Sequence, residues 1–156
     1  MKNHLLLQET NFNKLKNIVK ENSDKQIIFS SNNDELNRKV LEKLKIQILL
    51  LNLAGRKDFQ KQRNSGFNHV LAKLAKKQEV CIGINLDEII TSSPKQKSEI
   101  LARVRQNIKL CNKNKVKMCF VSSQKNQRNL HDLKSLGIVL GMHTSLVKKL
   151  IMCIPS

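Results

Sequence analysis

A histidine and two lysines at helical spacing are the first residues of this 156-residue chain that could do chemistry. In the stretch NSGFNHVLAKLAKK, residues 64–77, His69, Lys73 and Lys76 follow an i, i+4, i+7 spacing. At about 100° per residue, an α-helix gathers these three side chains on one face. The other face is expected to be apolar and to consist of Phe67, Val70, Leu71, Leu74 and Ala75. The cationic face is either a solvated surface or a binding surface for an anion.

A second helix is expected to carry the same kind of face. Pro94 suits the first turn of a helix, and apolar residues at helical spacing continue to about residue 112. Like charges along one helix face repel each other by roughly a few tenths of a kcal/mol per pair, a cost that phosphates lying over them would offset. A solvated basic face is the alternative. The row of cations consists of Arg105, Lys109 and Lys113 at i, i+4, i+8, with Arg103 on its flank.

The acidic residues, serines and histidines form no catalytic pattern. Asp87 and Glu88 are adjacent, so we expect their side chains to point to different sides of the element that holds them. There is no H-x-H, H-x-x-E or D-x-D pattern for a metal, and no serine lies in a nucleophile elbow. Only His69 of the four histidines is well placed, and a lone helical histidine is more often structural than catalytic. The sequence therefore favours a protein that binds over one that catalyses by itself.

The four cysteines also predict no metal site and no disulfide. None of them forms a C-x-x-C pair, and no histidine stands at zinc-ligand spacing from them. They lie in apolar segments, so we expect buried thiols in a reducing cytosol. The four are Cys81, Cys111, Cys119 and Cys153.

The charge is the most informative bulk property. The chain has 29 Lys and Arg against 12 Asp and Glu, a net charge of +17. Residues 46–156 hold 20 of the basic residues and six of the acidic ones. Such an excess indicates a polyanionic partner, and an aromatic content of 3% favours contacts with phosphates and helical shape over stacking on splayed bases. The alternative is a composition bias, since AT-rich genomes enrich proteins in Lys, Asn and Ile.

Length and hydropathy favour one domain, residues 1–156, outside the membrane. The longest apolar runs, such as residues 48–54, are far shorter than the roughly 20 residues that a membrane span needs. The N-terminal segment MKNHLLLQET has too short an apolar core for a signal peptide. We therefore expect a soluble, cytoplasmic protein with no membrane partner.

Short apolar runs alternate with segments of helical periodicity along the whole chain, which predicts parallel βαβ units and an α/β fold. One helix is expected to be capped by Asp34 and another by Asp132, and the segment SLVKKLIM near the C-terminus is expected to be helical. The strands are expected at residues 4–8, 26–31, 48–53, 80–86 and 118–121, with a short late strand as a sixth.

Polar clusters follow four of these strands, at the carboxyl ends where parallel sheets and α/β barrels place their working residues. The clusters are SSNN, GRKD, DEIITSS and SSQK. Connecting loops are polar in any protein, so the informative feature is the cations among them: Arg56, Lys57, Lys125 and Arg128.

Ordered motifs from about residue 11 to residue 153 resemble the ribonuclease P protein component 3 family, of the archaeal type. The motifs that carry the resemblance are GRKD (55–58), SGFNHVLAKLAKKQEVCIGINL (65–86), SSPKQKSEILARVRQNIKLCNKNKVKMCFVSS (92–123) and DLKSLGIVLGM (132–142). The resemblance implies a TIM-barrel-like fold, here a partial or open β/α barrel with parallel strands and helices outside. It also implies a subunit of the ribonucleoprotein that removes 5′ leaders from precursor tRNA.

In that enzyme the RNA subunit carries the active site with bound Mg²⁺, so the resemblance implies no catalytic residue and no cofactor on the protein. The implied partners are the ribonuclease P RNA, a small partner protein subunit and, indirectly, precursor tRNA. The RNA-contacting positions carried over from the family are Arg56, Lys57, His69, Lys73, Arg103, Arg105, Lys109, Ser122, Ser123, Lys125 and Arg128. Replacing Arg56 and His69 by alanine is expected to lower reconstituted activity and to leave the fold intact.

The chain departs from the family in three places. The family has further βα units ahead of the matching region, so an open barrel with exposed edges is expected here. FQKQRN (59–64) is inserted after GRKD and adds two cations, Lys61 and Arg63, to a loop aimed at RNA. The loop after the second Ser-Ser is short, and Leu130 stands where the family has a proline. The alternatives are a general structured-RNA-binding protein and a stand-alone metal-dependent phosphoesterase barrel.

Overall fold

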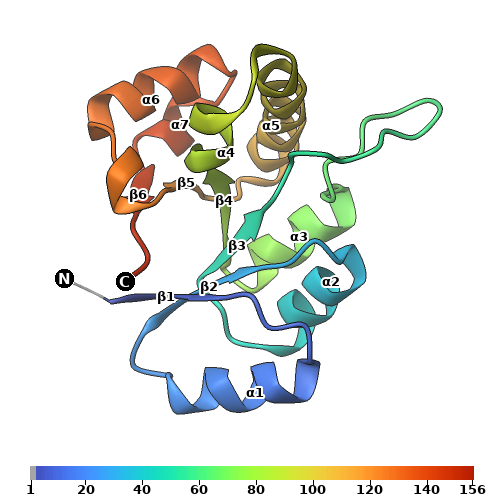
Figure 1. Ribbon diagram of the computed structural model, residues 1–156, viewed down its shortest axis with the longest axis vertical. Coiled ribbons are helices and arrows are strands. Elements are labelled where there is room, and N and C mark those ends of the chain that lie inside the picture. The colour runs from blue at the N-terminus through green and yellow to red at the C-terminus, as the bar shows by residue number, and fades with distance from the viewer. Residues whose placement is uncertain (1–2) are drawn as a thin grey trace.

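The computed structural model describes residues 3–156 as one curled sheet of six parallel strands with helices packed on its outside (Figure 1). The strands are neighbours in chain order, from β1 to β6. Their bounds are β1 His4–Leu7, β2 Gln26–Ser30, β3 Ile48–Leu51, β4 Cys81–Asn85, β5 Met118–Val121 and β6 Ile151–Cys153. The predicted α/β class and the partial TIM-barrel-like architecture are therefore confirmed.

Helical segments follow each of the first five strands, as parallel pairing requires. The longest helix, α5, has Pro94 in its first turn and closes with Lys115 in a left-handed conformation. The bounds are α1 Phe12–Glu21, α2 Asp34–Lys43, α3 His69–Lys77, α4 Leu86–Thr91, α5 Pro94–Asn114, the 3-10 turn η1 Gln124–Asn126, α6 Leu130–Val139 and α7 Thr144–Val147.

Asparagines cap most of the helices and correct two predictions. Asn33 accepts the amides of Glu35 and Leu36 and begins α2, so the predicted cap, Asp34, is the first helical residue instead. Asn129 caps α6 in the same way, which leaves Asp132 inside the first turn. The helices with an asparagine cap are α1, α2, α3, α4 and α6.

The outer face of the sheet and the helices form the main core. Alternate residues such as Phe29, Leu49 and Phe120 point outward and are fully buried under the helices. The α3 face differs from the predicted one, because Val70 is 46% exposed while Ala72 is fully buried. The buried stripe of α3 is therefore turned towards Leu71, Ala72 and Ala75.

The inner face of the sheet is a second, smaller core. Ile28, Ile48 and Val121 lie there with Cys119 and Cys153, and each is at most 3% exposed. Gly83 makes room for them, since a Cβ at that position would lie 3.1–3.2 Å from Ile48, Leu50 and Val121. These side chains are buried because the sheet curls around them and they pack against one another.

The segment after β6 reaches the opposite edge of the sheet. The Ser156 amide and hydroxyl both donate to the main-chain oxygen of His4 in β1, at 3.0 and 2.9 Å. Figure 1 shows the C-terminal end running down beside β1. The predicted exposed edge of β1 is therefore partly covered by the chain itself. The segment SLVKKLIM was predicted to be helical, but its last two residues belong to strand β6.

All four cysteines are free thiols; three are buried and Cys81 is half-buried. Burial raises the pKa of the Cys111 thiol, and hydrogen bonds with Cys153 and Cys81, together with burial, raise the pKa of Cys119. No helix within residues 3–156 is long and apolar enough to cross a membrane.

Candidate nucleic-acid interface

The carboxyl ends of the parallel strands lie along one rim of the sheet, and amide and hydroxyl side chains connect them. Asn85 at the end of β4 donates to Asn52 after β3, at 3.2 Å. Asn52 in turn donates to Ser30 at the end of β2, at 3.0 Å. These bonds hold the loops that follow β2, β3 and β4 in fixed positions relative to one another.

The acidic residues of this rim are engaged in structural bonds. Asp87 accepts from the main-chain amide and the hydroxyl of Ser123 and from the side-chain amide of Asn126, at 2.7–3.0 Å. The adjacent Glu88 accepts from the main-chain amides of Leu53 and Ala54, at 2.9 and 3.4 Å. The two carboxylates point to different neighbouring loops, as their adjacency in the sequence predicts. They are therefore not available as an acid–base pair.

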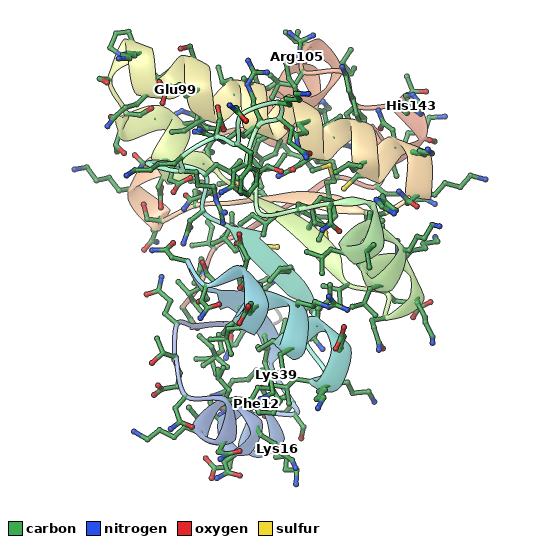
Figure 2. All side chains as sticks on the ribbon, turned by 90° about the vertical axis from the view of Figure 1, so that its right-hand side faces the viewer. Phe12, Lys16, Lys39, Glu99, Arg105 and His143 are labelled. Atoms are coloured by element: carbon green, nitrogen blue, oxygen red, sulfur yellow. The ribbon has the colours of Figure 1, made fainter. Side chains whose placement is uncertain are left out.

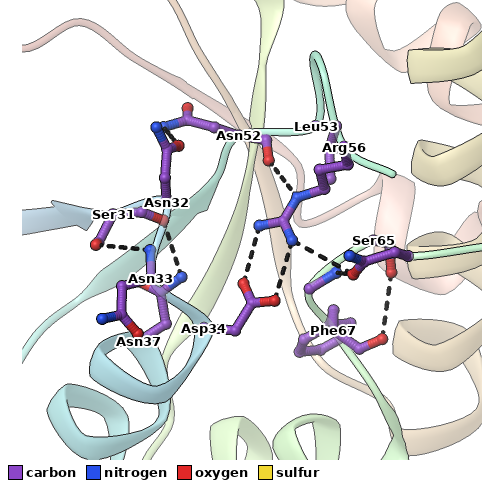
Figure 3. Close-up of polar contacts among 12 residues, drawn as sticks. Ser31, Asn32, Asn33, Asp34, Asn37, Asn52, Leu53, Arg56, Ser65 and Phe67 are labelled. Carbon is purple, nitrogen blue, oxygen red and sulfur yellow. Dashed lines mark hydrogen bonds and ion pairs between the residues drawn. The ribbon is translucent and has the colours of Figure 1, made fainter. Parts of the chain in front are cut away.

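Arg56 is a structural residue and not a surface cation. Its side chain is 10% exposed and makes a two-pronged ion pair with Asp34, at 3.0 and 3.1 Å (Figure 3). Its Nε also donates to the main-chain oxygen of Asn52, at 2.7 Å. The guanidinium packs on Gly66, where a Cβ would lie 2.5 Å away. The guanidinium of Arg56 is thus engaged within the chain, and the RNA contact there stays a prediction. Alanine at this position would remove a loop anchor.

Arg103 is also buried, because it sits on the side of α5 that faces the β3–α3 loop. Its guanidinium donates to the main-chain oxygens of Leu53 and Arg56, at 3.2 and 2.8 Å. It also donates to the Asp58 carboxylate, at 3.0 Å. With 3% of its surface exposed, Arg103 holds this loop in the structure, and its assignment as an RNA contact stays a prediction.

Asp58 joins the two ends of the same loop. One carboxylate oxygen accepts from the Asn64 main-chain amide, at 2.9 Å, as well as from Arg103. The hydrogen bond from the Asn64 amide is the largest cause that lowers the pKa of the Asp58 carboxyl, and the hydrogen bond from Arg103 is the next largest. The negative charge of Asp58 is thus stabilised inside the loop anchor.

The two predicted serines differ in accessibility. Ser122 is 2% exposed, so its hydroxyl lies beneath the surface, and the RNA contact there stays a prediction. Ser123 is exposed, but both its amide and its hydroxyl are bonded to Asp87. Ser123 therefore positions the β5–α6 loop.

The other predicted residues are exposed cations or a histidine. His69 and Lys73 lie on the outer side of α3, and Arg105 and Lys109 lie on the outer side of α5. Figure 2 shows Arg105 at the upper edge of the molecule, beside α5. Arg128 donates only to the neighbouring main-chain oxygen of Gln127, at 3.1 Å. The remaining exposed cations of the predicted set are Lys57 and Lys125.

The structure brings two of these residues to one groove. A groove of about 740 Å³ lies between α2, the β3–α3 loop, α3 and α5, and both His69 and Lys109 line it. Its walls also include Phe59 and Arg63 of the inserted FQKQRN stretch, and Arg38, which the sequence did not single out. Helical periodicity could not find these residues, because they come from a different helix and from an irregular loop.

A second basic cluster lies at the amino-terminal half of the chain and was also missed. A smaller groove of about 330 Å³ there is lined by Lys16, Lys20, Lys43 and Lys45. Lys20 and Lys43 stand in the last turns of α1 and α2, where a cation also stabilises the helix dipole. Nearby, the Lys39 ammonium lies 4.3 Å from the centre of the Phe12 ring (Figure 2).

No group of three or more His, Cys, Asp and Glu side chains within residues 3–156 could hold a metal ion. The site that the structure does provide is a set of exposed cations on rigid elements, with the carboxylates of Asp34, Asp58, Asp87 and Glu88 held in internal bonds. Such a surface can bind phosphates by charge and hydrogen bonding. The fold and the site together define a cationic α/β half-barrel suited to a polyanionic partner.

Comparison with known proteins specifies this class further. The chain belongs to the RNase P subunit p30 family, whose family model matches residues 3–156. It is 30% identical over 128 residues to ribonuclease P protein component 3 of Thermococcus kodakarensis, covering 80% of this chain and 55% of that protein. It is 32% identical over 110 residues to the Thermococcus gammatolerans protein of the same name, covering 69% and 48%.

A solved structure shows the same fold. The chain is similar to a chain of archaeal ribonuclease P with mature tRNA, with a TM-score of 0.78 and 25% identity. The match covers 94% of this chain and 62% of that one. The chain thus spans about half the length of the curated relatives it matches, and the half-barrel corresponds to part of a longer fold.

Proposed function

We propose that this chain acts as a protein subunit of ribonuclease P, which binds the RNA subunit and assists endonucleolytic removal of 5′ leaders from precursor tRNA. One observation carries the proposal: a member of this family displays exposed cations on α3, α5 and the strand-end loops, while Asp34, Asp58, Asp87 and Glu88 are engaged in internal bonds. These four carboxylates therefore offset little of the positive charge that a polyanion would meet at the rim.

In this proposal the protein carries no catalytic residue, and the active site with its Mg²⁺ belongs to the RNA. The bonds of Asp87 and Glu88 support this division, because both carboxylates already hold neighbouring loops. The contribution of the protein is to bind and orient RNA through Lys57, His69, Lys73, Arg105, Lys109, Lys125 and Arg128.

A small protein subunit of the same enzyme is the second proposed partner, and the cytoplasm is the proposed location of the assembly. A similar solved structure is that of an archaeal ribonuclease P with mature tRNA, which supports an RNA-containing assembly. Precursor tRNA is then met indirectly, through the RNA subunit.

Reconstitution tests the proposal. The chain is mixed with the ribonuclease P RNA of its own source and precursor tRNA, at low and high Mg²⁺. We expect the chain to raise cleavage at low Mg²⁺ and to cleave nothing without the RNA. Equal binding to unrelated structured RNAs, with no effect on cleavage, would show a general RNA-binding protein instead. Turnover of precursor tRNA by the chain alone would show a stand-alone enzyme.

A further inference from the structure

The loop between β3 and α3 contains a feature that the family resemblance does not explain. Residues 58–64, here called the finger, project from the body of the molecule beyond α3 (Figure 1). Most of the finger is the stretch FQKQRN, which lies between the GRKD and SGFNHV motifs and belongs to neither of them. Its function has to be derived from its own side chains.

The finger has a fixed base. Asp58 at its start accepts from the Asn64 amide at its end, at 2.9 Å, and the buried Arg103 donates to the same carboxylate oxygen. At the tip, the Phe59 amide donates to the main-chain oxygen of Gln62, at 2.9 Å. The loop is therefore closed at both its base and its tip, which reduces the entropy that it would lose on binding a partner.

The finger exposes an aromatic ring between cations. Phe59 is 64% exposed, whereas the other phenylalanines are buried or half-buried in the described part of the chain. Lys61 and Arg63 are exposed beside it, and neither forms an ion pair within residues 3–156. Phe59 and Arg63 also face the groove of about 740 Å³ that His69 and Lys109 line.

We propose that the finger is a nucleotide-stacking element: Phe59 stacks on an unpaired base of an RNA, while Lys61 and Arg63 bind the flanking phosphates. The inference rests on the proposed function, because it assumes that the chain meets RNA, and it adds a mode of contact that the charge alone does not predict. Aromatic rings flanked by cations bind single-stranded nucleotides in this way, since every base has a face for stacking.

Charge favours RNA over a protein partner at this place. The Asp58 carboxylate is paired with Arg103. The remaining charged side chains of the finger are those of Lys61 and Arg63, and both are positive. An apolar protein pocket that received Phe59 would have to desolvate both cations without a compensating partner. An unpaired nucleotide offers a stacking face and phosphates at once.

A fluorescence experiment tests the proposal, because the chain has no Trp and no Tyr. Phe59→Trp then carries a single reporter, which is titrated with the ribonuclease P RNA, with an RNA hairpin that has one bulged nucleotide, and with the same hairpin fully paired. We expect quenching by the first two RNAs and little by the third. Val139→Trp, at a position that is 76% exposed on α6, is the matched control and should show no quenching by any of them.

Affinity gives an independent readout. Phe59→Ala should weaken binding to the bulged hairpin about tenfold and leave the paired hairpin unchanged. Its salt dependence should stay that of the unsubstituted chain, because no phosphate contact is lost, whereas Lys61→Ala with Arg63→Ala should lower the slope by about two. Val139→Ala should change neither quantity.

Three results would overturn the inference. Binding of the ribonuclease P RNA without quenching at position 59 would refute stacking while leaving the proposed function in place. An effect of Phe59→Ala confined to assembly with the small protein subunit would make the finger a protein-docking element. Failure of the unsubstituted chain to bind any of the RNAs would refute both this inference and the proposed function.

Discussion

Two arginines of α5, two positions apart, are predicted to respond to substitution in opposite ways. Arg103 is 3% exposed and holds the β3–α3 loop, whereas Arg105 lies on the outer surface of the same helix. Arg103→Ala should therefore destabilise the fold. Arg105→Ala should leave stability unchanged and weaken RNA binding.

The magnitude follows from the bonds that Arg103 makes. Its guanidinium donates to the oxygens of Leu53 and Arg56, at 3.2 and 2.8 Å, and losing a bond from a charged donor costs about 1.5–3 kcal/mol. The Asp58 side chain is 43% exposed, so water can replace its bond and we count nothing for it. Two bonds at the lower end of the range amount to about 3 kcal/mol, or a fall of roughly 6–12 °C in Tm.

The assay has two parts. Urea unfolding followed by circular dichroism at 222 nm gives the free energy of unfolding of both variants and of the unsubstituted chain. Binding to the ribonuclease P RNA at several salt concentrations gives the affinity and the salt slope. For Arg105→Ala we expect a change in unfolding free energy within about 0.5 kcal/mol and a slope smaller by about one.

The reasoning would be refuted by the reverse pattern. If Arg103→Ala unfolded like the unsubstituted chain and lost about one unit of salt slope, its guanidinium would have to reach a phosphate in solution. If Arg105→Ala lowered stability as much as Arg103→Ala, the two faces of α5 would not differ as described. Arg103→Lys serves as a control, since an ammonium keeps the charge but cannot make the same forked set of bonds.

Three further predictions follow from single contacts. Gly66→Ala should cost about 1–3 kcal/mol in urea unfolding, because φ is +67° there and the new Cβ would lie 2.5 Å from the Arg56 guanidinium; unchanged stability would contradict this packing. The pKa of the Asp58 carboxyl is lower in the folded state than in the unfolded state. The Asp58 charge therefore stabilises the fold above the unfolded pKa of about 3.9, and this contribution is lost as the pH falls through the folded-state pKa. Asp58→Asn should therefore be less stable than the unsubstituted chain at pH 7, and the difference in unfolding free energy should shrink at about pH 3. A difference that grew on acidification would contradict a lowered pKa of Asp58 in the folded state. His69→Ala with Lys73→Ala should weaken RNA binding and reduce the salt slope while Tm stays unchanged, and a salt slope equal to that of the unsubstituted chain would remove α3 from the interface.

Much of the fold could be predicted from the sequence because burial patterns are local. A short run such as ILLL in β3 is apolar at every position, which is typical of a strand covered on both faces. The alternation of such runs with helical periodicity then predicts parallel βαβ units. The exposure of Lys73 and Lys109 follows in the same way from their position opposite an apolar stripe.

Features that the sequence did not predict arise where distant segments meet. Arg103 and Arg105 have the same charge on the same helix, and only the β3–α3 loop, about 45 residues earlier, buries one of them. Arg56 lies in a polar loop and would be expected to be exposed, but Asp34 from the preceding βα unit neutralises it. The capping residue of α2 was missed by one position because Asn33 and Asp34 are both good N-caps.

The sequence by itself thus determined the alternation of strands and helices, the excess of positive charge and the membership of a family, since these depend on residue types and their spacing. Only the tertiary structure decided which cations remain at the surface, because a guanidinium is engaged by carbonyls and carboxylates from other parts of the chain. It also decided that the sheet closes over its own inner face and that Phe59 projects from the loop next to His69 and Lys109. These outcomes depend on how the chain curls in space, and no local pattern encodes that curvature.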